Sequence, residues 1–157
     1  MTPFRLISPS FATGEPIPKR HARDGDNVSP ELEWTDPPPG ARSFVLIMED
    51  TDAPAPAFRQ WAVYDIPAER RHLPEGGSSG AREEGLPHGI NAFGHSRYDG
   101  PHPPHGDPPH DYRFRLAALG VAKLDVGPRP TAEEVWDAAR ANILGEADLI
   151  GTYQVPR

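Results

Sequence analysis

Prolines and glycines interrupt this chain so often that a long helix has almost no room to form. The 21 prolines and 15 glycines make up 36 of the 157 residues and are spread along the whole chain. Proline lacks a backbone N–H and breaks helices and central strands, whereas glycine favours turns. The apolar segments between them are short, as in SFVLIM and YRFRLAAL. This pattern is typical of a β-rich protein with many loops.

Several of these short segments have the pattern of strands. Residues 44–48 form a continuous apolar run that is too short for an ordinary helix, which predicts a strand buried on both faces. Leu32 and Trp34 alternate with charged residues, as in a half-buried strand. Further strands are expected at residues 61–66, 111–119 and 149–155.

A single segment, residues 131–145, has the pattern of a helix. Thr131 and Glu134 fit a capping box at its start, and Gly145 is expected to end it in the left-handed conformation. Many short strands followed by one helix predict a β-sandwich or barrel with a helical appendage. The length favours a single domain over residues 1–157.

Charge and composition exclude several classes of function. The net charge of −7 argues against non-specific nucleic-acid binding, which needs clustered Lys and Arg. No apolar run approaches the roughly 18 residues of a membrane span, and the first residues lack the pattern of a signal peptide. The chain has no cysteine for a disulfide or a thiolate metal site. We therefore expect a cytoplasmic protein with no nucleic-acid partner and no membrane span.

Polar residues at two predicted strand ends are the strongest candidates for a functional site. If the strand at residues 44–48 continues, Asp50 and Asp52 point to the same face, because side chains repeat every two residues. The same argument places His110 and Tyr112 on one face. Two carboxylates, an imidazole and a phenol would then share one polar pocket. Taken alone, Asp52 before an Ala-Pro pair is also typical of a turn.

The segment GPHPPHGDPPHD, residues 100–111, is expected to be a stiff loop. It belongs to a region rich in histidine, with His88, His95, His102, His105 and His110. Imidazoles suit zinc or copper, but the intervening Pro and Gly prevent a helical arrangement of ligands. We therefore expect a rim for a small pocket and no metal or other cofactor. An interaction surface that uses His102 and His105 is the alternative.

Three ordered motifs connect the chain to a known family: DTDAP, GPHPPHG and HDY. They correspond to a D-P-D-x-P box, a G-P-x-P-P-x-G loop and an H-R-Y strand start. With the surrounding stretches, they make the chain resemble the phosphatidylethanolamine-binding protein family, in particular its bacterial members known as Raf-kinase-inhibitor-like proteins. The resemblance implies an antiparallel β-sandwich with one or two short helices near the C-terminus. It also implies a small cavity that accepts phosphate-like anions, and a homodimer.

Carried over by motif, the resemblance gives a set of residues for this cavity. The expected ligand-binding residues are Asp50, Asp52, Pro54, Gly100, Pro101, His110 and Tyr112, with Gln60 and Trp61 beside them. It also implies a cis peptide bond before Pro54.

Three positions depart from the family pattern. Gln60 stands where the family usually has His, Thr51 replaces the proline of the box, and Asp111 replaces an Arg. Because Gln cannot become a cation, His110 is left as the one titratable imidazole of the pocket. We therefore expect weaker phosphate binding than in typical relatives, or a different small ligand.

These features predict a non-enzymatic protein that binds a small anionic or phosphorylated ligand, such as phosphate or a phosphoethanolamine headgroup, and modulates partner proteins. The alternative is a biosynthetic enzyme in which Asp50, His110 and Tyr112 carry out acid–base or cyclisation chemistry.

Overall fold

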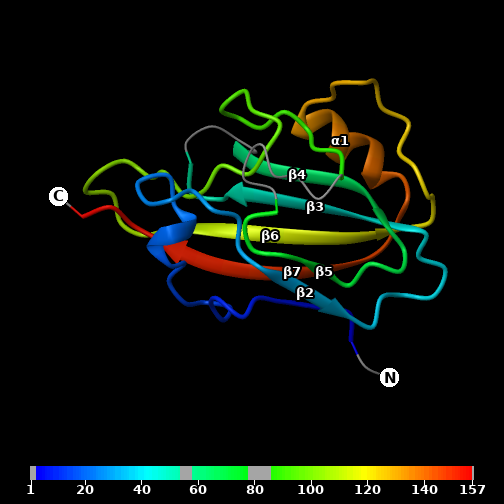
Figure 1. Cartoon of the computed structure of the whole chain (residues 1–157), viewed down its shortest axis with the longest axis horizontal. Coiled ribbons are helices and arrows are strands. Elements are labelled where there is room, and N and C mark those ends of the chain that lie inside the picture. The colour runs from blue at the N-terminus through cyan, green and yellow to red at the C-terminus, as the bar shows by residue number, and fades with distance from the viewer. Residues whose placement is uncertain (1–2, 54–57, 78–85, 157) are drawn as a thin grey trace.

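The strands form two antiparallel sheets, as Figure 1 shows for the computed structural model, which describes residues 3–53, 58–77 and 86–156. The larger sheet has the order β4 (Phe58–Pro67), β3 (Ser43–Asp50), β6 (His110–Leu119) and β7 (Ile143–Tyr153). The smaller sheet has the order β1 (Arg5–Ile7), β2 (Leu32–Thr35) and β5 (His72–Leu73). The predicted mainly-β fold, an antiparallel sandwich, is confirmed.

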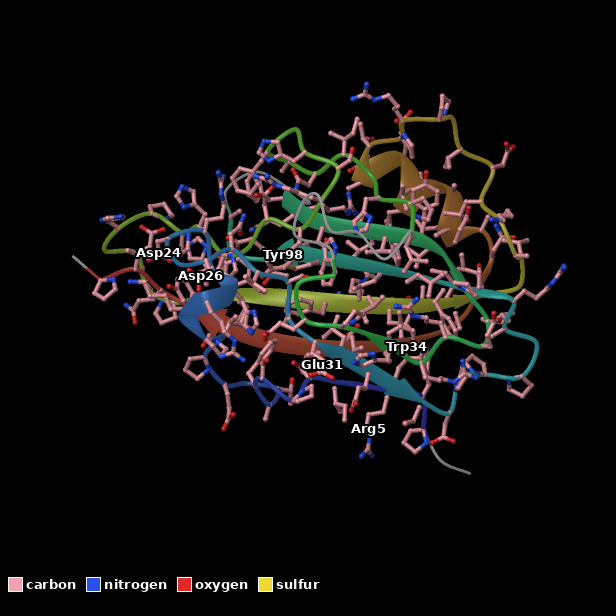
Figure 2. All side chains as sticks on the ribbon, viewed as in Figure 1. Arg5, Asp24, Asp26, Glu31, Trp34 and Tyr98 are labelled. Atoms are coloured by element: carbon pink, nitrogen blue, oxygen red, sulfur yellow. The ribbon has the colours of Figure 1, made fainter. Side chains whose placement is uncertain are left out.

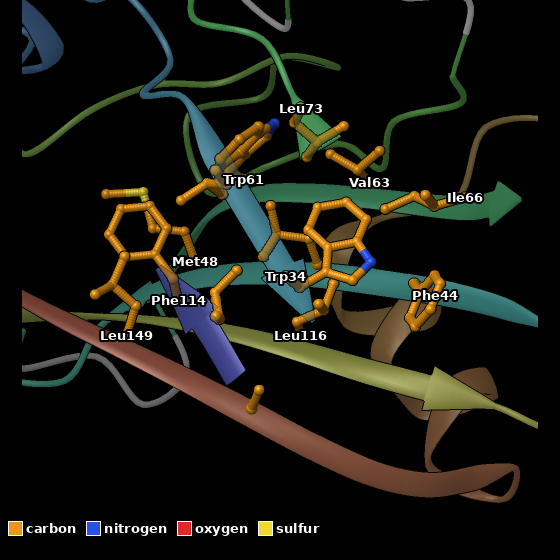
Figure 3. Close-up of a cluster of buried hydrophobic side chains, with 14 of the residues drawn as sticks. Trp34, Phe44, Met48, Trp61, Val63, Ile66, Leu73, Phe114, Leu116 and Leu149 are labelled. Atoms are coloured by element: carbon orange, nitrogen blue, oxygen red, sulfur yellow. The ribbon is translucent and has the colours of Figure 1, made fainter. Parts of the chain in front are cut away.

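The main core lies between the two sheets. Figure 3 shows Trp34 of β2 facing Phe44 of β3, and their ring centroids are 5.6 Å apart. The same apolar cluster continues through Trp61 of β4 and Phe114 of β6. Burial of these large rings supplies much of the hydrophobic free energy that holds the sheets together.

Strand β3 is buried on both faces, as its continuous apolar run predicts. All eight of its residues are buried. Phe44 and Met48 belong to the core between the sheets, whereas Val45 and Ile47 pack on the opposite face, in the cluster that includes α1 (Ala132–Arg140). Helix α1 therefore covers the face of the larger sheet that the smaller sheet leaves free.

Helix α1 begins as predicted but ends earlier. The side chain of Thr131 accepts from the Glu134 N–H, and the Glu134 side chain accepts in return from the Thr131 N–H, which completes the capping box. The helix ends at Arg140, with Ala141 as a right-handed cap. A second, very short helix, η1, spans Lys19–His21. Across the described part of the chain, no helix has the length and apolar character needed to cross a membrane.

The prediction that Gly145 ends the helix is wrong. Gly145 lies inside β7 and pairs with Ala118 of β6, so the strand also begins well before residue 149. Pairing with β6 over the whole strand outweighs the local turn preference of glycine. The residue suits this position for another reason, since a Cβ built on Gly145 would lie 3.0 Å from Cγ of Pro38.

Candidate functional site

The ends of β3 and β6 bring an aspartate and a histidine into contact. Asp50 is the last residue of β3, and His110 is the first residue of β6. The antiparallel register pairs Asp50 with Tyr112, which places His110 just beyond it. His110 Nδ1 lies 2.7 Å from Oδ2 of Asp50, and both side chains are buried. Asp50 and His110, two of the four residues predicted to share a pocket, are therefore neighbours in space.

A second carboxylate contacts the other nitrogen of the same ring. Oδ2 of Asp107 lies 3.0 Å from His110 Nε2. Burial by itself lowers the pKa of His110, but hydrogen bonds and charges from Asp50 and Asp107 outweigh it and raise the pKa above 6.5. Because a carboxylate only accepts hydrogen bonds, both contacts require an N–H, which is the doubly protonated, cationic imidazole.

Tyr112 lies beside this pair and has a buried hydroxyl. Its ring stacks on His110 with centroids 6.4 Å apart and an interplanar angle of 26°. The hydroxyl makes no hydrogen bond of normal geometry with a described residue. Burial, followed by the charge of Asp50, raises the pKa of Tyr112 far above its usual value. The phenol is therefore a neutral potential donor beside the Asp–His pair.

Asp52 takes up the turn position rather than a place in the extended strand. It is exposed and follows the last residue of β3, so strand alternation does not apply to it. Its Oδ2 accepts from the Asp111 N–H at 2.6 Å, and its own N–H donates to Oδ1 of Asp50 at 2.9 Å. Asp52 thus fixes the end of β3 against β6 and orients Asp50.

A small cavity of about 170 Å³ opens beside the Asp–His pair. Its lining residues are Asp50, Ala53, Phe58, His102, Pro103, Pro104 and His110. Sites for drug-sized ligands are usually about 300–1,000 Å³, so this cavity has room for a small chemical group only. The proline-rich sequence predicts the His–Pro loop as a rim, but the strand pattern alone does not distinguish Phe58 from a core residue.

The other predicted site residues that the structure describes do not line the cavity. Most of them support the loop beside it, and Pro54 lies outside the described residues. Gln60 donates from Nε2 to the carbonyls of Asp99, at 3.0 Å, and Gly100. Trp61 packs edge-on against Tyr98 in the core. The carbonyl of Pro101 accepts from the Arg23 N–H at 3.0 Å. These residues support the loop, and Pro54, with its expected cis bond, lies outside the described residues.

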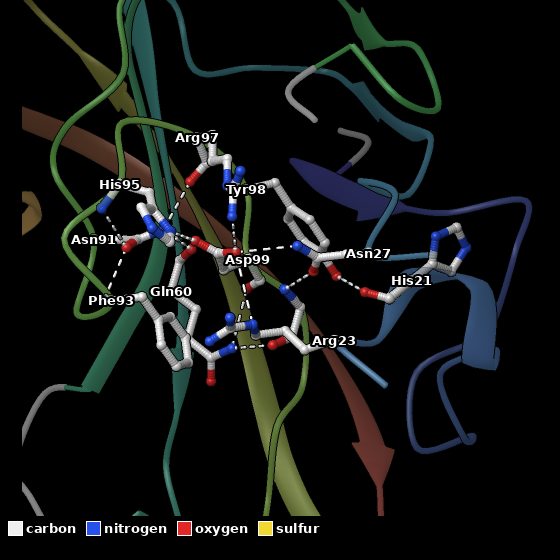
Figure 4. Close-up of polar contacts among 11 residues, drawn as sticks. His21, Arg23, Asn27, Gln60, Asn91, Phe93, His95, Arg97, Tyr98 and Asp99 are labelled. Carbon is white, nitrogen blue, oxygen red and sulfur yellow. Dashed lines mark hydrogen bonds and ion pairs between the residues drawn. The ribbon is translucent and has the colours of Figure 1, made fainter. Parts of the chain in front are cut away.

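A buried carboxylate that the sequence analysis missed anchors the same loop (Figure 4). Asp99 is fully buried and directly precedes Gly100. Its oxygens accept from Asn27 at 3.0 Å and Asn91 at 2.8 Å, and they also contact His95 and Arg97. Burial acts to raise the pKa of Asp99, but these contacts lower it overall. Because its partners are spread over many residues, no local motif marks this network.

The histidine-rich region does not form a metal cluster within the described residues. In those residues, the side chains close enough to share one metal ion are Glu31, Glu33 and His72. Glu33 and His72 pair across two strands of the smaller sheet, and Glu31, labelled in Figure 2, directly precedes β2. Glu31 and His72 already hydrogen-bond each other at 2.7 Å, and both are partly exposed. An ordinary hydrogen bond between two partly exposed side chains accounts for this contact.

The fold and the site together define an antiparallel β-sandwich with a small polar cavity at the ends of two neighbouring strands. The sequence pattern of the phosphatidylethanolamine-binding protein family matches residues 7–154. The chain belongs to this family.

Relatives from distant organisms agree with this assignment. The chain is 42% identical over 151 residues to a UPF0098 protein of Aquifex aeolicus, covering 96% of this chain and 88% of the relative. It is 40% identical to the UPF0098 protein YbhB of Escherichia coli, with 96% and 99% covered. The crystal structure of E. coli YbcL, described as a member of the mammalian PEBP family, superposes with a TM-score of 0.91 at 31% identity, covering 98% and 99% of the two chains.

One further relative is described as a lipoprotein. The putative lipoprotein LppC of Mycobacterium tuberculosis is 36% identical, and the alignment covers 97% of this chain but 73% of LppC.

Proposed function

We propose that this protein binds a small anionic or phosphorylated ligand in the cavity beside His110. The observation that carries this proposal is the buried Asp50–His110 pair, with a 2.7 Å contact, at a cavity of about 170 Å³. The pair keeps a cationic imidazole in a place that is mostly shielded from water. An electrostatic contact there is stronger than the same contact on the surface.

Charge determines how an anion fits this site. Asp50 and Asp107 hold His110 in its cationic form, and a phosphate oxygen is a strong acceptor for such a donor. Tyr112 offers a neutral hydroxyl nearby, since its raised pKa keeps it protonated at physiological pH. Phosphate binding should therefore weaken as the pH rises through the pKa of His110.

The cavity size sets the part of the ligand that is recognised. It accommodates a phosphate or a compact headgroup, whereas an acyl chain would have to lie elsewhere. The chemical group that all these candidate ligands share is a phosphate, free or as a monoester or diester. Free phosphate tests binding of a bare anion, and phosphoethanolamine tests binding of a headgroup that carries its own cation.

The enzyme alternative has less support from the geometry. A general base needs a free lone pair within reach of the substrate. Both ring nitrogens of His110 face carboxylates instead, and Tyr112 has a pKa raised too far for a phenolate at neutral pH. This arrangement favours recognition of charge over proton transfer.

The proposal can be tested by titration calorimetry and NMR. The probes are phosphate, phosphoethanolamine, acetate and a nucleotide. We expect phosphate or phosphoethanolamine to bind the wild type and to shift signals of Phe58 and His102. His110→Ala should abolish this binding. The matched control is His105→Ala, because His105 is an exposed histidine of the same loop and does not line the cavity. Absence of binding by every probe, or equal binding by His110→Ala, would contradict the proposal.

A further inference from the structure

Both nitrogens of the His110 ring are already in use in the free protein. Nδ1 is 2.7 Å from Asp50, and Nε2 is 3.0 Å from Asp107. A ligand oxygen that accepts a hydrogen bond from this ring must therefore replace one of the two carboxylates.

The two carboxylates differ in how easily they can be replaced. The Asp50 side chain is 5% exposed and its second oxygen accepts from the Asp52 N–H. The Asp107 side chain is 42% exposed, and His110 is the one described residue that hydrogen-bonds its carboxylate. Asp107 can return to water at little cost, whereas Asp50 would be left buried without its partner. Asp107 is therefore the group that gives way.

The backbone around Asp107 is fixed, so a side-chain rotation is sufficient for its release. Gly106 has a positive φ of 83° and donates its N–H to the carbonyl of Val155 at 2.8 Å. Pro108 and Pro109 follow and restrict the chain up to β6. The loop holds the Asp107 carboxylate near Nε2 without burying it.

We propose that Asp107 is an internal competitor for the ligand: its carboxylate occupies the Nε2 side of His110 until a phosphate group displaces it. This inference rests on the proposed function of the cavity. Exchange of the Asp107 carboxylate for a phosphate group keeps two negative groups in contact with the imidazolium instead of three, which explains how an anion binds beside Asp50. If Asp107 stayed in place, three negative groups would surround one imidazolium.

The competitor also sets the selectivity of the site. Acetate carries the same group as Asp107, but the tethered carboxylate acts at an effective concentration of about millimolar or higher. Free carboxylates should therefore be excluded. A phosphate dianion makes stronger charge-assisted hydrogen bonds and can displace the tethered group. The ligand class is thus phosphate and phosphate monoesters, with carboxylates rejected.

The test compares Asp107→Asn with a matched charge control, Asp111→Asn. Asp111 is exposed and adjacent to His110, and with the described residues it hydrogen-bonds through its backbone N–H and carbonyl. Calorimetric titration with phosphate and with acetate at about pH 7 gives the affinities. We expect Asp107→Asn to tighten phosphate binding by about tenfold and to make acetate binding measurable. Asp111→Asn should stay within about twofold of the wild type, because Asp111 is exposed and its charge is screened by water and salt.

Each other outcome overturns the competition. Equal affinity in Asp107→Asn and wild type would overturn it and leave the proposed function intact. An equal increase in phosphate affinity in both variants would indicate a general effect of negative charge and would also overturn the competition. No phosphate binding by any of the proteins would overturn the competition and the proposed function together. NMR titration gives a ligand-free check, because the His110 pKa should fall in Asp107→Asn and stay unchanged in Asp111→Asn.

Discussion

The side-chain amide of Gln60 donates a hydrogen bond to the backbone carbonyl of Gly100, which lies forty residues further along the chain. The same nitrogen also donates to the carbonyl of Asp99 at 3.0 Å. Gln60 is almost fully buried in β4. It therefore connects the larger sheet to the start of the loop that lines the cavity.

Removal of this amide should destabilise the protein. Gln60→Ala leaves two buried carbonyls without a donor, and we expect a loss of about 1–3 kcal/mol in the free energy of unfolding. Urea denaturation measures the loss. Gln154→Ala is the control, because Gln154 is exposed and should change stability by no more than about 0.5 kcal/mol. Similar losses in both variants would contradict the role of Gln60.

The protonation of His110 should stabilise the folded state. Although burial lowers its pKa, Asp50 and Asp107 raise it above 6.5 overall. The stabilisation is therefore fully present below the unfolded-state pKa of about 6.5 and is lost as the pH rises through the folded-state pKa. We expect the stability difference between wild type and His110→Gln to shrink over this interval. Urea denaturation at a series of pH values checks this, and a difference that does not vary with pH would refute it.

Asp99 should contribute stability of the opposite pH dependence. Its pKa is lowered, since contacts with His95, Asn91, Asn27 and Arg97 outweigh the effect of burial. The contribution is present above the unfolded-state pKa and is lost as the pH falls through the folded-state value.

The corresponding variant is Asp99→Asn. We expect a loss of about 3 kcal/mol at neutral pH, at the lower end of the range for broken buried ion pairs, because the arginine partners of Asp99, Arg23 and Arg97, are themselves partly exposed. Asp125→Asn, at an exposed position, serves as the control. The stability of both variants can be followed by circular dichroism as the pH is lowered. The difference in stability between Asp99→Asn and Asp125→Asn should become smaller at low pH. A difference that stays constant would argue against an ionic origin of the stabilisation by Asp99.

Gly100 should not tolerate a side chain. A Cβ at this position would lie 1.8 Å from the backbone carbonyl oxygen of His21. The backbone has to move to relieve such a clash, and we expect Gly100→Ala to cost about 3 kcal/mol. Gly127→Ala is the matched control, because a Cβ there meets nothing within 4 Å. Thermal denaturation should separate the two variants clearly, and equal melting temperatures would show that the loop adjusts freely.

Features that depend on neighbouring residues were predicted well from the sequence. The continuous apolar run of β3 predicts that both faces of the strand are buried, and they are. The Thr131–Glu134 capping box is a contact between residues three positions apart, so it can be recognised in the sequence. Alternation assigned Asp50 and His110 to strand faces, but the contact between them spans 60 residues and depends on the pairing of β3 with β6. Features set by distant parts of the chain were not predicted. Gly145 enters β7 because β6 is available to pair with it.

The same limit applies around the cavity. The contact between Asp107 and His110 depends on the path of the loop rather than on a motif. Asp99 has partners as far away as Asn27, 72 residues earlier, so its burial leaves no local trace in the sequence. The sequence allowed two positions for Asp52, on the face of an extended strand or in a turn. The structure places it in the turn.

The span of these contacts has a consequence for how the protein folds. Asp50 and His110 are 60 residues apart, and the loop between them is anchored through Asp99 to Asn27. Such non-local pairings form slowly, because long loops must close first. The cavity is therefore complete only when β3, β4 and β6 have all assembled. During refolding or synthesis, ligand binding should therefore appear only after these strands have assembled. It would then indicate that the whole chain has reached its native state.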